Sequence, residues 1–507
     1  MKKTLSLLPV LYFGIQSALL AQPTIVWEKS FGGTYTDVGR DIISSEDGNY
    51  LALCRPYSKD GDVLNNHGST DYWLLKLDQS GQIIWQKTYG GSDEDDAARI
   101  IPASDGGYML FGSTLSKNGD VSANHGGNDF WLVKINPAGD ILWQKTYGGS
   151  KNDRGKSIIP TDDGGYMLIG DADSDDFEVP NNHHGETDLW LIKITANGDI
   201  IWSKLYGGNY GDEGNCIIPT LDGGYIIAGT STSTNGDAAG NHGSTDSWIL
   251  KIDSIGTKQW KRVQGGTDTE FCRSIVITDD GGYLVLNSTA SVTGAFSANH
   301  GSFDIWLYKL SSTGVFEWQK FYGGSNSDGA NELIKLSNGK YLLLASTYSN
   351  DGDLMGSTGG SAWMICINQN GDIIWNNRYG DSSAGLASIA QLEDGKFIAI
   401  GNNGSNFSNA GDVWVVSFSP TTGVKSPFSE QIELKIAPNP ATNYFELRSA
   451  ETLDYCMVSI SAMLGPVLLQ QRLDASHRID ASSLPPGFYM LQLECHGKSG
   501  RSVLIKI

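Results

Sequence analysis

Residues Asp129 to Gly149 decide the fold, and they read DFWLVKINPAGDILWQKTYGG. Alternating apolar positions predict a strand in each half, and the Pro-Ala-Gly-Asp segment predicts a tight turn between them. Trp131 and Trp143 lie 12 residues apart in this stretch. The same pair recurs with a period of 57 to 59 residues, at Trp73/Trp85, Trp190/Trp202, Trp248/Trp260, Trp306/Trp318 and Trp363/Trp375. A constant period of this length predicts a repeat architecture.

Each repeat contains four predicted strands. In the second full unit these are residues 98–103, 108–113, 129–135 and 141–147, which we denote a, b, c and d. The turn at Asp105-Gly106-Gly107 joins a to b, and a long loop over residues 115–128 joins b to c. Four short antiparallel strands per repeat are typical of a β-propeller blade.

Two further tryptophans predict how the ring closes. Trp27 lies in a d-like stretch, residues 25–31, and Trp414 lies in a c-like stretch, residues 412–418. The seventh unit has an a strand near residues 387–392 and a b strand at 396–401, but no d strand of its own. We therefore predict that residues 22–419 form a seven-bladed propeller whose N-terminal strand completes the last blade and removes an exposed edge.

The tryptophans also suggest how neighbouring blades contact each other. The stretch Asp78 to Trp85, DQSGQIIW, resembles the tryptophan-docking repeat of quinoprotein propellers. The resemblance implies that each indole packs between blades. A structural role also suits tryptophan, since one side chain buries roughly 150–250 Å².

The remaining parts of the chain predict export. Residues 1–21 have the charge and apolar pattern of a signal peptide, with Lys2 and Lys3 at its start. The later sequence contains no apolar run long enough for a transmembrane helix. The formal charge of −21 argues against nucleic acid and anionic membranes as partners.

A different composition marks the C-terminal part. Residues 420–431 are predicted to be a linker, and residues 432–507 lack tryptophan and contain alternating stretches that predict a small β-sandwich. The six cysteines form no metal-binding spacing. Cys456 and Cys495 either form a disulfide or remain buried thiols.

The C-terminal part resembles the sorting domain of type IX secretion cargo. The matching residues are Pro438-Asn439-Pro440, Gly465-Pro466-Val467, Leu484 to Tyr489 and Val503 to Ile507. The resemblance implies passage across the outer membrane by the type IX secretion machinery, which would bind residues 432–507. It also implies a product that is released or held at the cell surface.

Topology selects one face of the ring for function. With the strand order a-b-c-d, the long b–c loops and the d–a loops share one face, and loops on a rigid scaffold often bind ligands. Four residues after the second glycine of each Tyr-Gly-Gly-like motif is an acidic residue, and the seventh unit has Gly385 there. The six acids either line the channel mouth and bind a ligand or cation, or cap a repeated turn: Asp37, Asp95, Asp153, Asp212, Glu270 and Asp328.

The b–c loops are repeated as well. They contain Asp-Gly-Asp-like segments and Asn-His-Gly motifs, the latter with His67, His125, His242 and His300, and a His-His-Gly variant at His184. Three interpretations fit: calcium bound by the acids, a transition metal bound by the histidines, or a loop that folds on itself with each histidine bonded to the Asp that opens strand c. The calcium interpretation uses Asp60, Asp62, Asp120, Asp351 and Asp353.

No catalytic motif is evident, including GxSxG, HExxH and phosphate-binding glycine loops. We therefore expect a secreted or surface-displayed binding or adhesion scaffold for a glycan or protein. The alternative is a secreted glycan-acting hydrolase or lyase that uses acids at the channel mouth.

Overall fold

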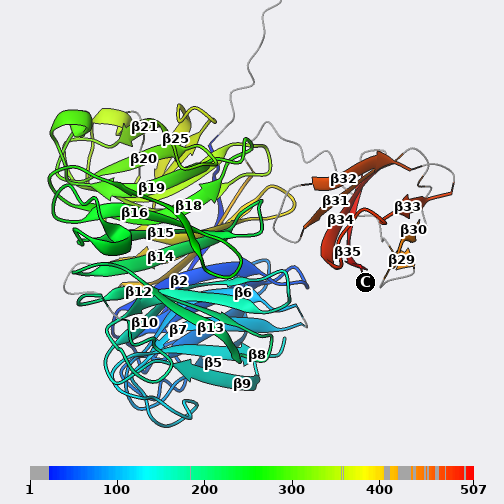
Figure 1. The fold of residues 1–507 in the computed structure, drawn as a ribbon, viewed down its shortest axis with the longest axis horizontal. Helices are drawn as coiled ribbons and strands as arrows, with labels where there is room; N and C mark the ends of the chain where they lie inside the picture. The colour runs from blue at the N-terminus through cyan, green and yellow to red at the C-terminus, as the bar shows by residue number, and fades with distance from the viewer. Residues whose placement is uncertain are drawn as a thin grey trace, which may run out of the picture.

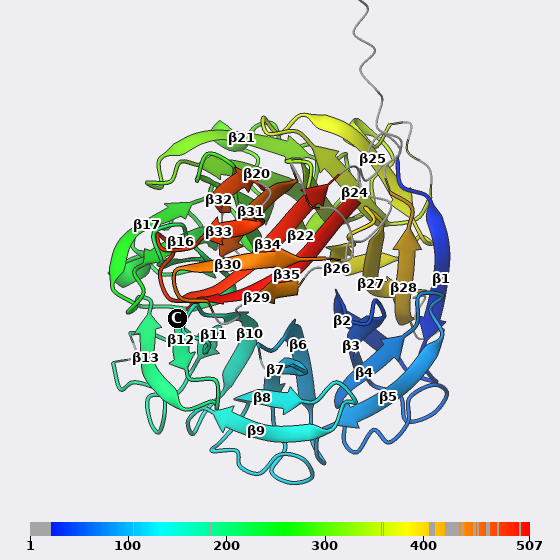
Figure 2. The ribbon, with the colours of Figure 1, turned by 90° about the vertical axis from the view of Figure 1, so that its right-hand side faces the viewer.

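The computed structural model describes residues 22–506, apart from 105, 183, 356, 358, 405–410, 421–434, 438–440, 450–452, 454–455, 463–466, 474–475 and 496–497. The predicted signal peptide and all of the predicted linker except its first residue lie outside the described residues. Seven four-stranded antiparallel sheets follow one another around a ring (Figure 2). The prediction of a seven-bladed β-propeller is confirmed.

The a and b strands form the inner half of each blade. The a strands are β2 (Asp37–Ser44), β6 (Asp95–Pro102), β10 (Asp153–Pro160), β14 (Asp212–Pro219), β18 (Glu270–Ile277), β22 (Asp328–Lys335) and β26 (Gly385–Gln391). The b strands are β3 (Tyr50–Pro56), β7 (Tyr108–Thr114), β11 (Tyr166–Ala172), β15 (Tyr225–Ser231), β19 (Tyr283–Thr289), β23 (Tyr341–Thr347) and β27 (Phe397–Asn403).

The c and d strands form the outer half. The c strands are β4 (Tyr72–Leu77), β8 (Asp129–Ile135), β12 (Asp188–Ile194), β16 (Asp246–Ile252), β20 (Asp304–Leu310), β24 (Ala362–Ile367) and β28 (Asp412–Phe418). The d strands are β5 (Ile83–Tyr89), β9 (Ile141–Tyr147), β13 (Ile200–Tyr206), β17 (Lys258–Gln264), β21 (Phe316–Tyr322), β25 (Ile373–Tyr379) and β1 (Ile25–Phe31). Short 3₁₀ turns occur in three b–c loops: η1 (Gly236–Ala238), η2 (Gly294–Phe296) and η3 (Gly352–Leu354).

A β-bulge interrupts every a strand near its start. In β6 the register skips Ala98, between Ala97 and Arg99. Because a bulge breaks the two-residue alternation of side chains, the sequence pattern becomes regular only after it. This explains why the predicted a strand began at Ala98, three residues after the observed start at Asp95.

The N-terminal strand closes the ring as predicted. β1 pairs with β28 in a sheet of order β1-β28-β27-β26, and Phe31 pairs with Val413. The Trp414 indole N–H donates to Glu28 at 2.9 Å, and the Tyr379 hydroxyl donates to the Pro23 carbonyl at 2.6 Å. Equivalent tyrosines, such as Tyr89, bond to the turn before the d strand of the next blade, so residues 23–31 fill the d position in full.

The core consists of layers between blades. A separate cluster of buried apolar side chains fills each of the seven blade interfaces. The seven c-strand tryptophans are fully buried within them: Trp73, Trp131, Trp190, Trp248, Trp306, Trp363 and Trp414. The d-strand indoles dock on the next blade as the resemblance implied. A Cβ added to Gly81 of the first blade would lie 2.6 Å from Trp27 of the closing strand, and Gly81 has a φ of +77°.

The C-terminal part contains two further sheets, coloured orange to red in Figure 1. One sheet has the order β29-β30-β33, from β29 (Lys435–Ala437), β30 (Tyr444–Arg448) and β33 (Arg478–Asp480). The other has the order β32-β31-β34-β35, from β31 (Met457–Ala462), β32 (Val467–Arg472), β34 (Gly487–Cys495) and β35 (Lys498–Lys506). Side chains of both sheets share one buried cluster, which includes Phe445, Ile460 and Leu491.

The cysteines agree with the first of the two predicted states for the C-terminal part. Cys456 is disulfide-bonded. The side chain of Cys495, its predicted partner, lies outside the described residues. Cys54, Cys216, Cys272 and Cys366 are free thiols in the propeller.

Candidate functional site at the mouth of the channel

Exposed aromatic side chains are concentrated on one face of the ring. We call the face formed by the b–c and d–a loops the loop face. Of the seven strongly exposed aromatic side chains among the described propeller residues, only Phe316 lies towards the opposite face. The other six belong to the loop face or to the channel mouth beside it: Tyr35, Tyr57, Phe177, Tyr210, Phe271 and Tyr348. Aromatic rings contribute much of the contact area of binding sites.

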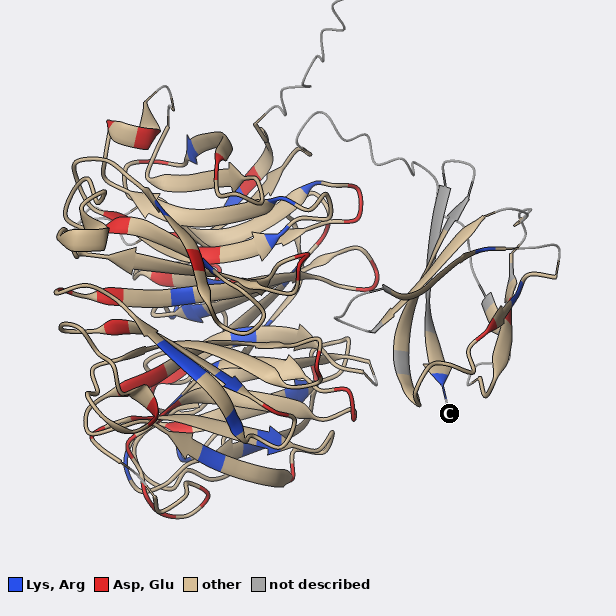
Figure 3. Ribbon diagram, turned by 45° about the horizontal axis from the view of Figure 1, so that its top comes forward, with Lys and Arg blue, Asp and Glu red and all other residues tan. Residues whose placement is uncertain are grey.

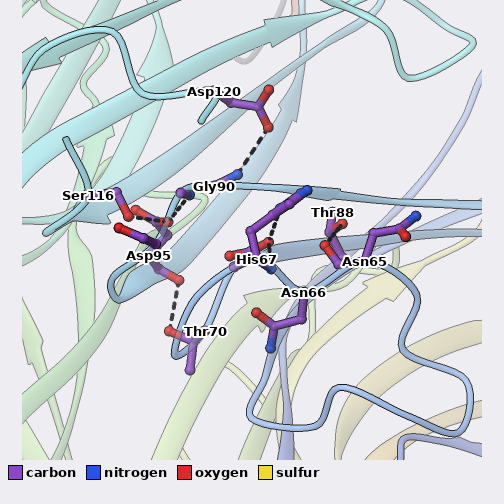
Figure 4. A network of polar contacts seen from close by, with 12 residues as sticks. Asn65, Asn66, His67, Thr70, Thr88, Gly90, Asp95, Ser116 and Asp120 are labelled. Atoms are coloured by element: carbon purple, nitrogen blue, oxygen red, sulfur yellow. Dashed lines mark hydrogen bonds and ion pairs between the residues drawn. The ribbon is translucent and has the colours of Figure 1, made fainter. Parts of the chain in front are cut away.

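The six predicted acids open the a strands on this side of the ring. Their side chains are fully buried. In every case the carboxylate accepts a hydrogen bond from the backbone N–H of the second glycine four residues earlier, at 2.6–2.9 Å. Figure 4 shows Asp95, which also accepts a hydrogen bond from Ser116 at 2.9 Å, at the start of the b–c loop of the same blade. The acids therefore fasten two loops together in this structure, and ligand binding by them stays a prediction.

The seventh blade lacks this acid, and the equivalent position is Ala384 rather than the expected Gly385. Leu386 and Ser388 pair with Gly401 and Ile400, as Ala330 and Glu332 pair with Ala345 and Leu344 in the sixth blade. This register makes Ala384 the equivalent of Asp328. The d–a turn of the last blade is one residue shorter, which a count from the glycine motif did not detect.

A second acid lies beside each of the six, and we call each such pair of carboxyls a junction. The second acid is the Asp at the start of strand c in the preceding blade, which is Asp412 for the pair at the ring closure. At the first junction a Cβ added to Gly90 would lie 2.5 Å from Asp95 Oδ2 and 2.6 Å from Asp71 Oδ1. Burial raises the pKa of both carboxyls, and it raises the pKa of Asp95 to about 6. The like charge of Asp71 raises the pKa of Asp95 further. The Asp71 Oδ1 atom is buried and has no hydrogen-bond partner.

The same pairing recurs around the ring. The other pairs are Asp129 with Asp153, Asp188 with Asp212, Asp246 with Glu270, Asp304 with Asp328 and Asp412 with Asp37. Burial raises the pKa of Asp153, Asp212 and Asp304 to about 6, and raises the pKa of Asp129, Asp246 and Asp412. Each junction thus contains at least one carboxyl that holds its proton more tightly than an exposed one.

The Asp-Gly-Asp segments bind backbone N–H groups of the neighbouring d–a turn. Asp60 accepts from Thr34 N–H at 2.7 Å, and Asp351 accepts from Ser325 N–H at 2.7 Å. Asp62, Asp120 and Asp353 accept from the first glycine of each motif at 3.1–3.2 Å, as Figure 4 shows for Asp120 and Gly90. Across the described residues, no group of three or more acidic, His or Cys side chains is placed to hold a metal ion. Calcium binding stays a prediction.

Removal of calcium tests that prediction directly. Because these loops are already held by N–H donors, we expect EDTA followed by calcium to leave the melting temperature of the full mature chain unchanged. A calcium site saturated at about 1,000 times its Kd would add about 4 kcal/mol of stability. A large rise on calcium addition, absent with magnesium, would instead show that the loops bind the ion.

The loop histidines bond to the Asp that opens strand c, which is the contact that the self-folding interpretation predicts. The Nδ1 to Oδ2 distances are 2.7 Å for His67, 3.0 Å for His125, 2.8 Å for His242 and 2.9 Å for His300. The same carboxylate also accepts from the backbone N–H of the histidine, for example at 3.0 Å in the His67–Asp71 pair.

A cavity of about 310 Å³ opens at the channel mouth on the loop face, across the third, fourth and fifth blades. Its charged, amide and aromatic lining comes from the starts of the a strands: Lys156, Glu213, Asn215, Phe271 and Arg273. Lys156, Asn215 and Arg273 are the bulged residues of β10, β14 and β18, and each lies where its a strand's register skips one residue. The sequence analysis did not identify these residues. The interruption of the apolar–polar alternation at each bulge was the signal that could have identified them.

The charges in this cavity differ in how far they are neutralised. Lys156 lies 3.4 Å from the buried Asp171. The Arg273 guanidinium lies over the Phe271 ring, 5.5 Å from its centroid, and has no carboxylate within salt-bridge distance in the described residues. The Phe271 ring stacks on Phe303 and remains 38% exposed. Partial desolvation at the cavity, with the like charge of Asp171, raises the pKa of the exposed Glu213, although Lys156, Arg154 and Arg273 oppose this shift.

Deeper in the channel, an ion network joins blades that are far apart in sequence. Arg99 of β6 contacts Glu332 of β22 at 3.2 Å and Asp41 of β2 at 3.4 Å. Ser388 of β26 donates to the same Asp41 at 2.8 Å. The network crosses the channel and ties the blades on either side of the ring closure.

Figure 3 shows that Lys and Arg lie mainly along strands, whereas Asp and Glu mark loops and strand ends.

The C-terminal sheets account for the destination of the protein. Residues 435–506 match the family model described as the secretion system C-terminal sorting domain. The chain is therefore an exported β-propeller protein, secreted or attached to the cell surface, and its tail interacts with the type IX secretion machinery. In the described residues no helix is long and apolar enough to cross a membrane.

Comparison of the chain with known proteins gives similarities at low sequence identity. The chain is 22% identical over 399 residues to the regulatory protein FlaEY of Caulobacter vibrioides, covering 70% of this chain and 41% of that protein. It is 11% identical to the type IX secretion component PorZ of Porphyromonas gingivalis, with a TM-score of 0.42 and coverage of 91% and 58%. It is 10% identical to a PL25 ulvan lyase, with a TM-score of 0.45 and coverage of 77% and 95%.

Proposed function

We propose that the protein is an exported binding scaffold that captures an extracellular glycan or protein on its loop face, in an adhesion role. The observation that carries the proposal is that the channel-mouth cavity and six of the seven strongly exposed propeller aromatics lie on the same side of the ring. That side also carries the long b–c loops.

The physical support is the contrast between the two faces. Tyr210 lies in the d–a loop beside the cavity and is 48% exposed, and Phe271 lines the cavity itself. On the opposite face the exposed apolar side chains of the fourth blade are aliphatic and stand singly in tight turns, at Leu221 and Ile255. Aromatic anchors around a polar cavity are typical of binding sites, whereas single aliphatic side chains are ordinary on any surface.

The competing proposal is a glycan-acting hydrolase or lyase. Most glycoside hydrolases need two carboxyl groups, about 5–9.5 Å apart, that both reach the substrate. The lining of the cavity contains one carboxylate, that of Glu213. The six acids that open the a strands are buried and accept hydrogen bonds from the loops. This arrangement favours binding over hydrolysis.

The test compares loop-face variants with matched variants of the opposite face. The mature full-length chain is screened against arrays of glycans and extracellular matrix proteins. We expect Phe271→Ala and Tyr210→Ala to weaken capture about thirtyfold each, which corresponds to the loss of about 2 kcal/mol typical of hot-spot residues. Leu221→Ala and Ile255→Ala should leave it unchanged.

Two outcomes would contradict the proposal. Capture that survives both loop-face substitutions and is lost on the opposite face would place the binding surface elsewhere. Release of reducing ends or unsaturated sugars from a bound glycan, abolished by Glu213→Gln, would establish the enzyme instead.

A further inference from the structure

We infer that the channel-mouth cavity binds a sugar that carries a carboxylate, such as a uronic or sialic acid residue of an acidic glycan. The inference rests on the proposed function and narrows it to one class of ligand. It depends on three features of the cavity: its polar lining, its guanidinium without a carboxylate partner, and the opposing charge of Glu213.

The lining favours a sugar over a peptide. Phe271 contributes the only apolar side chain among the lining residues, and the others include Thr230, Thr245, Asn215 and Glu213. Hydroxyl, amide and carboxylate groups match the hydroxyls of a sugar ring as donors and acceptors. A peptide anchor would instead need a pocket lined by several apolar side chains. The volume lies at the low end of ligand pockets, about 300–1,000 Å³, and suits the end of a glycan chain.

The unpaired guanidinium favours an anionic sugar. Arg40, Arg55, Arg99 and Arg154 each contact a carboxylate at 3.4 Å or less. Arg262 and Arg378 donate to backbone carbonyls instead. Arg273 has no carboxylate and no hydrogen-bond acceptor among the described residues, although the chain carries 57 acidic residues against 36 basic ones. A guanidinium presents a planar set of N–H donors that fits a carboxylate with two parallel hydrogen bonds.

The charge of Glu213 allows a stricter test of the inference. It lines the same cavity with a like charge to the proposed ligand, so it opposes a carboxylate and is neutral towards an uncharged sugar. Substitution of Glu213 by Gln keeps the shape and an acceptor oxygen but removes the charge. Substitution of Glu213 should therefore raise the affinity for acidic sugars, and substitution of Arg273 should lower it.

The experiment measures affinity of the full mature chain for three acidic probes and their neutral counterparts by calorimetry. The probes are trigalacturonate with its methyl ester, a hyaluronan hexasaccharide with its carboxyl-reduced form, and sialyllactose with lactose. We expect at least one acid to bind about tenfold or more tightly than its counterpart. Arg273→Ala should remove that difference, and Glu213→Gln should enlarge it about threefold.

Lys320→Ala is the matched control, because it removes a cation from the outer strand of the same blade, where Lys320 forms an exposed pair with Asp372. It should leave every affinity unchanged. A folded Arg273→Ala variant that keeps the acid preference would overturn the inference.

The remaining outcomes separate this inference from the proposed function. Equal binding of acidic and neutral sugars, or binding of proteins alone on the arrays, would overturn the acidic-sugar assignment and leave the binding scaffold standing. Failure of every probe and every array ligand would overturn both.

Discussion

Deletion of residues 23–33 is expected to abolish the cooperative thermal unfolding of the propeller. The deletion removes β1, whose backbone pairs with β28 from Ile25 to Phe31. It also removes Phe31 and Trp27 from the cluster between the seventh and first blades. Loss of one large buried aromatic side chain typically costs about 3–5 kcal/mol, and whole domains have only about 5–15 kcal/mol of stability. The closed ring should therefore not survive.

Calorimetry of the full chain tests this expectation, with a graded variant beside the deletion. Glu28→Ala leaves β1 in place but removes the acceptor of the Trp414 indole N–H, and should cost about 1–3 kcal/mol. A chain that begins at residue 22 is the control. If the deleted chain melted at the temperature of this control, the closing role of β1 would be refuted.

The second large effect is on pH dependence, and its sign is unusual. A carboxyl whose pKa is raised on folding binds more protons in the folded state, between its unfolded pKa of about 4 and its folded pKa. For Asp95, Asp153, Asp212 and Asp304 the folded pKa is about 6. The free energy of unfolding should therefore fall as pH rises through about 4 to 6. Between pH 5 and pH 8 the loss is about 1 kcal/mol for each such junction.

Other carboxyls set the acidic limit. The Lys76 ammonium lowers the pKa of Asp47, so the stability that this pair contributes is present above about pH 4 and is lost as pH falls further. We therefore expect maximum stability near pH 5, measured by urea unfolding across pH 3 to 8. A maximum at pH 7 to 8 would contradict the raised pKa values of these paired carboxyls.

One junction can be isolated by substitution. Asp71→Asn keeps an acceptor for His67 and places an amide N–H beside Asp95, where the wild type has an unpartnered oxygen. The variant should be about 1 kcal/mol more stable than wild type at pH 8 and equal to it at pH 5. Asp199→Asn, which alters an exposed pair with Lys145, serves as the control and should change neither value.

The sequence was sufficient for the fold because the structural constraints repeat. The turn glycines and paired tryptophans occur in every unit, and predicted strands such as 129–135 and 141–147 match β8 and β9. The a strands were less predictable, because the bulge at Ala98 and its equivalents breaks the alternation that identifies a strand. The short turn before Ala384 hid the register of the last blade for a related reason, since spacing alone does not reveal one missing residue.

The candidate site was less predictable than the fold. Repetition highlighted Asp95 and its equivalents, which the structure shows to be buried in a repeated hydrogen-bond pattern. The cavity depends on residues that differ between blades, such as Glu213, Phe271 and Arg273. A residue that differs from its equivalents in other blades can be seen in the sequence. Which of these residues face one another in space depends on the curvature of the ring.

The pairing of Phe31 with Val413 has a consequence for how the molecule assembles. β1 is the earliest propeller strand to be synthesised, and its partner β28 is the last. Long-range pairing of this kind is slow to form, and an unpaired strand edge invites aggregation in the meantime. The seventh blade should thus be the last to assemble, and a prematurely terminated chain would expose an apolar edge at each end of an open ring, a ready target for quality-control proteolysis.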